Sequence, residues 1–227
     1  MIVDAHAHLW KAVESSARTI VDSRCDIPAA LLKTYLAEHG VDRAVLVQPM
    51  YPGEDNSLIL DVARAEPDRF AAVVVAHTPE ALARQTGARG LRVRPVFEGI
   101  GSDALWEAAA GLVVSVLGRP EHVKDVERKA ERFPGIPIVV DHFLHGEAVL
   151  ELARFPNVHV KVSGTHHFGF REGLLKDVVN RFGAERLLWG SDFPHVLLRG
   201  GYAAALRLVE GLPDSVRGGT AKRLYWP

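Results

Sequence analysis

Short apolar segments rich in valine, isoleucine and leucine recur along this 227-residue chain, and a stretch with helical spacing follows each of them. Most of these apolar segments lack the polar alternation of a half-exposed strand, so we expect both faces of each strand to be buried. Burial on both faces is typical of parallel strands that are covered by helices. The predicted strands are residues 2–6, 43–48, 70–76, 91–96, 112–117, 136–141, 158–163 and 187–191.

The predicted helices lie between these strands, and several of them begin or end at a proline or glycine. They are residues 28–38, 57–65, 79–85, 103–110, 120–133, 146–154, 172–182 and 202–210, with a last helix at 215–225. Eight strand–helix pairs predict an α/β protein with a (β/α)8 barrel, in a single domain over residues 1–227. An open, doubly wound sheet is the alternative. It is disfavoured because the sequence His6-Ala7-His8, rather than a glycine-rich phosphate turn, follows the first strand.

Charge and cysteine content exclude several classes of protein. The 27 basic and 28 acidic residues leave a net charge of −1, so nucleic-acid binding has little support. The single cysteine, Cys25, has no partner for an internal disulfide, and no local motif would activate it as a nucleophile. No apolar run reaches the ~20 residues that a membrane helix requires. The chain begins with a strand-like segment rather than a leader, so we expect a cytoplasmic protein that does not bind membranes.

Four polar residues stand where three of the predicted strands end. His6 and His8 close the first strand, and strand alternation points both side chains the same way. His142 follows the sixth strand and Asp192 follows the eighth. In a barrel, the carboxyl ends of the strands meet at the active-site face. Three imidazoles and one carboxylate gathered there can hold a metal ion, or polarise a carbonyl group, and activate water.

Four motifs together resemble the amidohydrolase superfamily, and in particular its amidohydrolase-related branch of lactonases and non-oxidative decarboxylases. They are IVDAHAHLW at 2–10, VDH at 140–142, VKVSG at 160–164 and RLLWGSDFP at 186–194. The resemblance runs along the whole chain. It implies that His6, His8 and Asp192 are metal ligands and that Asp192 also takes the proton of the attacking water. It further implies that His142 binds either the metal or the substrate carbonyl.

One departure from the family pattern bears on the metal. Related enzymes usually add a histidine from strand five, and binuclear members add a lysine from strand four, but residues 112–118 and 91–94 contain neither. A binuclear centre is therefore disfavoured. Two alternatives stay open: one divalent ion, zinc or manganese, held by His6, His8, Asp192 and His142, or a metal-free scheme in which the histidines donate hydrogen bonds and Asp192 alone activates water.

Several basic residues are candidate substrate contacts. Arg92 and Arg94 share one face at the end of strand four, and Arg119 follows strand five, so these guanidinium groups suit a carboxylate. His166 and His195 lie in loops on the expected site face. We interpret Lys161, on strand seven, as a structural ion-pair partner. The long segment 9–27 is predicted to fold over the pocket as a partial lid.

The leading hypothesis is a hydrolase that opens a lactone or similar cyclic ester bearing a carboxylate or hydroxyl groups. The runner-up is a metal-dependent non-oxidative decarboxylase, which the missing strand-five histidine disfavours. A barrel that binds a ligand without turnover is the third alternative. We expect a small anionic or hydroxylated substrate, and because dimers are common in the family, the resemblance also raises a homodimer as an expectation.

Overall fold

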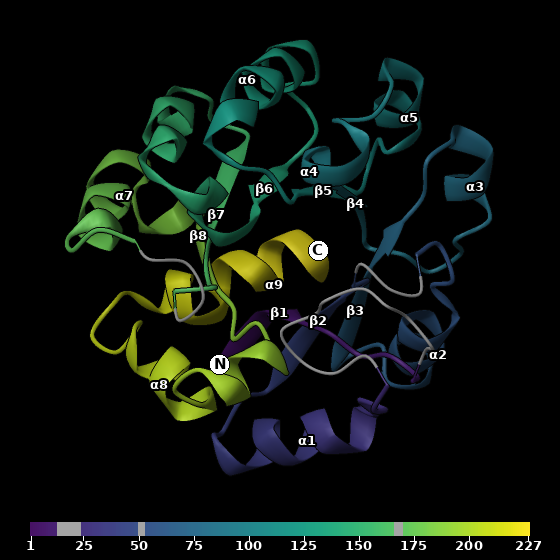
Figure 1. The fold of residues 1–227 in the computed structure, drawn as a ribbon, viewed down its shortest axis with the longest axis vertical. Helices are drawn as coiled ribbons and strands as arrows, with labels where there is room; N and C mark the ends of the chain where they lie inside the picture. Colours follow the sequence, from purple (N-terminus) through teal and green to yellow (C-terminus); the bar gives the residue numbers. More distant parts are fainter. Residues whose placement is uncertain (13–23, 50–52, 166–169) are drawn as a thin grey trace.

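Eight parallel strands form one sheet whose order follows the chain, from β1 to β8. A computed structural model of the protein describes residues 1–12, 24–49, 53–165 and 170–227. The (β/α)8 barrel predicted from the alternation is confirmed (Figure 1). The strands are β1 Val3–Ala7, β2 Arg43–Val47, β3 Phe70–Val75, β4 Gly90–Val93, β5 Val113–Val116, β6 Ile138–Val140, β7 Val158–Val162 and β8 Leu187–Trp189.

Helices surround the strands, as Figure 1 shows. The α-helices are α1 Ala29–Glu38, α2 Ser57–Ala65, α3 Pro79–Ala83, α4 Pro95–Glu98, α5 Asp103–Ala108, α6 Val123–Arg132, α7 Leu174–Phe182, α8 Tyr202–Arg207 and α9 Thr220–Tyr225. The 3-10 segments are Pro120–His122, Glu147–Arg154, Ala184–Arg186 and His195–Leu198. A turn with positive φ covers most of Asp141–His145, and a π-helical turn at Ser215–Gly219 precedes α9. Within the described residues, no helix is both long and apolar enough to cross a membrane.

Several predicted elements differ in extent or type from the expectation, and two of them serve as examples. Strand four was predicted to reach residue 96, but β4 stops at Val93 because Pro95 begins α4, with Arg94 at its N-cap position. A helix was predicted at 146–154, and the structure has a 3-10 segment there instead, from Glu147 to Arg154. The first difference lies at the carboxyl end of a strand, and it takes Arg94 off the strand that carries Arg92.

The barrel interior is apolar at one end and polar at the other. Small and branched side chains from the strands pack with Ala221 and Tyr225 of α9, which closes the amino-terminal end of the barrel. A second and larger apolar layer lies between the strands and the surrounding helices. Near the carboxyl ends of the strands, the interior holds buried polar groups instead, among them His6, Ser115 and Lys161. The site is therefore built at the open end, above an apolar floor.

The ring closes between β1 and the segment that follows β8. The amide N–H of Asp192 donates to the carbonyl of His6 over 2.9 Å, and that of His8 donates to the carbonyl of Phe193 over 2.7 Å. Gly190 lies so close to β1 that a Cβ atom there would stand 2.7 Å from Cβ of His6. A glycine at this position lets the two backbones approach, and so it brings the Asp192 segment against the histidine pair.

Candidate active site

His6 and His8 form a pair on one side of β1 and its extension. His6 is fully buried, His8 is almost so, and their Nε2 atoms lie 3.1 Å apart. The other ring nitrogen of His8, Nδ1, lies 2.7 Å from the carbonyl oxygen of Val47 on β2. Because a carbonyl oxygen only accepts hydrogen bonds, Nδ1 of His8 carries a proton, and the neutral ring then presents a lone pair on Nε2. The sequence expectation that both rings point the same way matches this arrangement.

Asp192 completes a compact donor set. Its Oδ1 lies 3.4 Å from Nε2 of His8 and 3.7 Å from Nε2 of His6. The residue adopts a left-handed backbone with φ of 61°, a conformation that aspartate tolerates better than most residues. The ligand atoms of His6, His8 and Asp192 all lie within 4.8 Å of one another.

The separations within this set fit one divalent ion. Zinc binds histidine nitrogen at ~2.0–2.1 Å in tetrahedral geometry, which places neighbouring ligand atoms roughly 3.3 Å apart. The His6–His8 and His8–Asp192 distances of 3.1 and 3.4 Å agree with that spacing. The hydrogen bond from His8 to Val47 is the kind of outer contact that fixes the tautomer of a metal-binding imidazole. His142, predicted as a fourth ligand, is outside the set of mutually close atoms and lies beside it.

His142 reaches the site on a strained turn. Residues 142–145 follow β6 with φ between 51 and 55°, so four L-amino acids in succession adopt left-handed conformation. Each such residue costs ~1–2 kcal/mol, and strain of this kind is often kept where a functional side chain must be aimed. The turn places the His142 ring 4.7 Å from that of His6, between centroids, with Nδ1 2.9 Å from Oγ of Ser163. It also delivers His145, which the sequence reasoning missed.

A buried ionic network lies beneath the histidines. The Asp141 carboxylate accepts hydrogen bonds from Nζ of Lys161 at 2.9 Å, Oγ of Ser115 at 2.8 Å and NH2 of Arg92 at 3.2 Å. Lys161 Nζ also lies 3.1 Å from Nδ1 of His6. The sequence reasoning assigned no role to Asp141 or Ser115. The available signal was a polar residue inside an otherwise apolar strand, which marks a buried hydrogen-bonding position.

A cavity of about 220 Å³ opens above the donor set. The predicted contacts Arg92, Arg119 and His195 line it, but Arg92 also uses its guanidinium to bind Asp141 and the carbonyl of Gln48. His166 lies outside the described residues. Among the described residues, the lining consists of His8, Pro49, Arg92, Val96, Phe97, Leu117, Arg119, His142, His145, Asp192 and His195.

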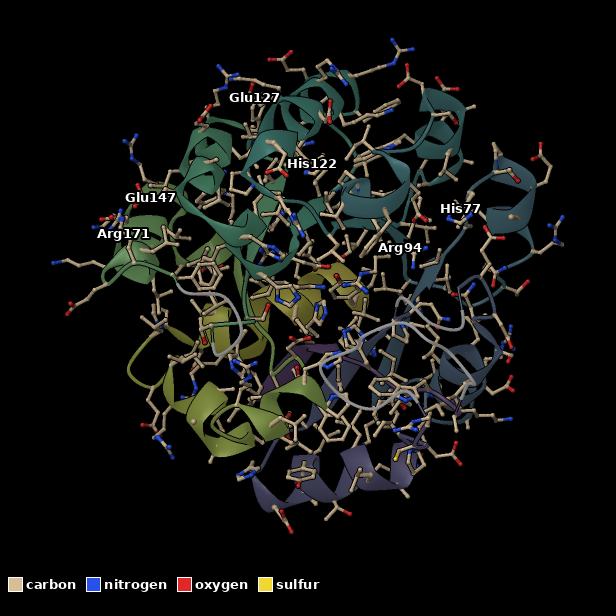
Figure 2. The ribbon with its side chains drawn as sticks, in the orientation of Figure 1. His77, Arg94, His122, Glu127, Glu147 and Arg171 are labelled. Carbon is tan, nitrogen blue, oxygen red and sulfur yellow. The ribbon has the colours of Figure 1, made fainter. Side chains whose placement is uncertain are left out.

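Arg94 does not line this cavity. Its Nε and NH2 atoms donate to the two carboxylate oxygens of Glu98 over 2.7 and 2.8 Å. Glu98 in turn contacts Nε2 of His77 at 2.9 Å, and Figure 2 shows Arg94 and His77 on the same side of the barrel. Because β4 ends before Arg94, that residue serves the ion pairs of this rim instead of sharing a pocket face with Arg92.

The predicted lid is described only at its base. Trp10 pairs with Ile27 through two backbone hydrogen bonds, and the indole N–H of Trp10 donates to the carbonyl of Cys25. The Trp10 ring stacks on His195 with 5.8 Å between centroids, so the start of this segment borders the pocket. Residues 13–23, which would form the lid itself, lie outside the described residues.

Burial sets the charge states of the site. It lowers the pKa of His142 to about 4 and that of His6 well below its ordinary value, helped at His6 by the charge of Lys161. Burial alone would raise the pKa of Asp192, but the surrounding imidazoles, that of His142 first, outweigh it and hold that pKa well below the usual range. At neutral pH the carboxylate is therefore ionised beside neutral imidazoles. This combination suits both a general base and a metal ligand set.

The buried histidines predict a loss of stability in mild acid. Burial lowers the pKa of His142 and of His159 from 6.5 to about 4, so between these values the unfolded chain binds more protons than the native protein. The free energy of unfolding then falls as pH falls from 6.5 to 4, by roughly 3 kcal/mol for each histidine over the full window. Burial raises the pKa of Asp4, so this residue keeps a proton in the native protein at higher pH than in the unfolded chain. It opposes the loss of stability by at most one proton.

Denaturant unfolding at pH 7.0, 5.5 and 4.5 measures this dependence. His159 lies at the amino-terminal start of β7 and does not line the cavity. His159→Gln is therefore a matched variant that should remove the contribution of one histidine to the pH dependence without changing the pocket. An unfolding free energy that is constant from pH 7 to 4.5 would contradict the neutral, buried state of these rings.

Comparisons with known proteins agree with the architecture and identify the family. The sequence profile of the amidohydrolase family matches residues 3–225. The L-fucono-1,5-lactonase of Burkholderia ambifaria is 30% identical over 266 aligned positions, which cover 97% of this chain and 90% of that protein. The 4-sulfomuconolactone hydrolase of Hydrogenophaga intermedia is 28% identical over 69% of this chain and 61% of its own length.

A solved structure extends the match to three dimensions. An amidohydrolase from Burkholderia multivorans, crystallised with bound zinc, superposes with a TM-score of 0.85 at 22% identity, over 100% of this chain and 99% of that one. At this identity the likeness establishes the shared barrel, and the profile match over nearly the whole sequence establishes the family. The chain belongs to the amidohydrolase family.

Proposed function

We propose that this protein is a lactonase, which opens a lactone or similar cyclic ester by adding water to its carbonyl carbon. The observation that carries the proposal is the ionised Asp192 carboxylate, 3.4 Å from Nε2 of His8 in the wall of a small cavity. The names of the two curated relatives, a fuconolactonase and a sulfomuconolactone hydrolase, support a lactone as the substrate class.

Asp192 is placed to act as the base. As water adds to the carbonyl carbon, Asp192 accepts one proton from it, and the carbonyl oxygen gains negative charge. When the ring C–O bond breaks, the departing oxygen needs a proton, and protonated Asp192 can return the one it took. The ring then opens to a hydroxy acid with no other reactant consumed.

The imidazoles are placed to stabilise the charge that develops on the carbonyl oxygen. The Ser163 hydroxyl can donate a hydrogen bond to Nδ1 of His142. Neutral His142 then carries its own proton on Nε2, which gives the hydrogen-bond donor that an oxyanion requires. The set of His6, His8 and Asp192 would hold one divalent ion, zinc or manganese, which when bound supplies Lewis-acid polarisation of the same oxygen. Either arrangement uses the same residues of this chain.

The cavity also defines a substrate class. Arg119 brings a positive charge to it, while Val96, Phe97 and Leu117 form an apolar wall. We therefore propose a compact lactone that carries a carboxylate, sulfonate or hydroxyl group beside an apolar ring face, with Arg92, Arg119 and His195 as its contacts. Arg94 is not among the proposed contacts, because Glu98 occupies its guanidinium.

A lactone panel tests this function directly. Acid release from neutral sugar lactones and from carboxylated or sulfonated lactones is followed with a pH indicator, before and after treatment with a chelator. We expect turnover of at least one lactone, with higher kcat/KM for substrates that carry a polar or anionic group. Inactivity on the whole panel, combined with carbon dioxide release from a hydroxybenzoate, would replace the proposal with the decarboxylase alternative.

A further inference from the structure

The hydrogen-bond donors and acceptors of the histidine pair form a chain whose directions are fixed. His8 must donate from Nδ1 to the carbonyl of Val47, which leaves a lone pair on its Nε2. Nε2 of His6 lies 3.1 Å from that lone pair, so His6 must carry its proton on Nε2. The Nδ1 atom of His6 is then an acceptor, and Lys161 Nζ lies 3.1 Å from it.

Lys161 satisfies all of its donors in this arrangement. An ammonium group has three N–H bonds, and Nζ has three acceptors: Nδ1 of His6 at 3.1 Å, Oδ1 of Asp141 at 2.9 Å and Oγ of Ser115 at 3.1 Å. The Ser115 hydroxyl in turn donates a hydrogen bond to Oδ1 of Asp141 over 2.8 Å. Lys161 and Asp141 are both fully buried, so every one of these contacts is made without bulk solvent.

We infer that Lys161 is a positioning residue that holds His6 in the tautomer protonated on Nε2 and thereby lowers the affinity of the His6–His8–Asp192 set for a divalent cation. A metal ligand must offer a lone pair, so His6 can bind an ion through Nε2 only if its proton moves to Nδ1. There the proton would meet an N–H of Lys161 instead of an acceptor. The buried ammonium charge also repels a cation bound on the other side of the same ring.

The same geometry contains the alternative state. Oδ1 of Asp141 lies 3.5 Å from Nδ1 of His6. Without Lys161, His6 can donate from Nδ1 to Asp141 and turn the lone pair of Nε2 toward His8 and Asp192. A carboxylate that accepts from the far nitrogen of a metal-binding histidine is the arrangement that strengthens such ligands. Lys161 thus favours the tautomer of His6 that is protonated on Nε2, whereas a bound ion requires the tautomer that is protonated on Nδ1.

Lys161→Met tests the inference, because methionine keeps most of the buried volume and removes the charge and the donors. Zinc affinity is measured by competition with a chromophoric chelator on protein stripped of metal. We expect Lys161→Met to bind zinc ~10-fold more tightly than the wild type, or better. Lys129→Met is the matched control, since Lys129 is also buried and paired with an aspartate, Asp103, but lies on α6. It should leave zinc affinity unchanged.

Two further measurements keep the inference open to refutation if Lys161→Met does not fold. Nitrogen-15 NMR of histidine-labelled, metal-stripped wild type reports each tautomer, with the His6 signal assigned by its loss in His6→Gln. We expect protonation of His6 on Nε2, and protonation on Nδ1 would overturn the inference. Asp141→Asn, which removes the carboxylate that the metal-binding tautomer needs, should weaken zinc binding. Unchanged or weaker zinc binding by folded Lys161→Met would equally overturn it. None of these results depends on which lactone the enzyme opens.

Discussion

Replacing Asp192 with asparagine should lower kcat for lactone hydrolysis by ~1000-fold, the scale that a positioned general base contributes. An amide cannot take a proton from water at neutral pH, whereas the Asp192 carboxylate is ionised there because its pKa lies well below the usual range. Asparagine keeps the size of the side chain, and it tolerates the left-handed backbone at this position, where φ is 61°. The variant should therefore fold normally and lose only its catalytic activity.

The measurement is kcat on the best lactone of the panel, with circular dichroism and a melting curve to establish that the fold is intact. Asp61→Asn is the matched control, because Asp61 is an exposed aspartate on α2 and its replacement makes the same chemical change far from the cavity. Retention of more than a tenth of wild-type kcat by folded Asp192→Asn would remove this carboxylate from the proton-transfer step.

The barrel follows from the sequence because burial on both faces leaves a clear pattern. Apolar segments such as the one that became β3, Phe70–Val75, have no exposed face to mark with polar residues, and this is what a parallel sheet under helices requires. Strand ends were less accurate. Arg94 looked like a continuation of its strand, and only the proline that follows it signals the turn into α4.

The meeting of His6, His8 and Asp192 was also predictable, since parallel strands bring their carboxyl ends to one face. The left-handed turn after β6 was not. Phenylalanine and leucine at 143 and 144 give no local signal for positive φ, a conformation that glycine or asparagine usually marks. His145 consequently went unnoticed. Tertiary packing around the pocket imposes this turn against local preference, and local preference is what a single sequence reveals most directly.

A second large effect, on stability, is expected at Asp4, which links β1 to the segment that follows β8. Its carboxylate is fully buried and accepts from the amide of Ser191 at 2.9 Å, the hydroxyl of Ser191 at 2.6 Å, the hydroxyl of Tyr202 at 2.8 Å and the amide of His6 at 3.1 Å. Asp4→Ala would leave all of these donors buried without that acceptor. We expect it to lower the free energy of unfolding by ~3–5 kcal/mol.

Guanidinium unfolding measures this loss, with Asp214→Ala as the control because Asp214 is 94% exposed and should change stability by less than ~0.5 kcal/mol. Asp4→Asn keeps one carbonyl acceptor and should fall between the two. Ser191 directly precedes Asp192, so loosening its bond to Asp4 should also displace the carboxylate that we propose as the base, and folded Asp4→Asn should lose kcat along with stability. If Asp4→Ala were as stable as the wild type, closure of the ring would have to rest on the backbone hydrogen bonds of His6 and His8 alone, and Asp192 would then keep its place without support from below.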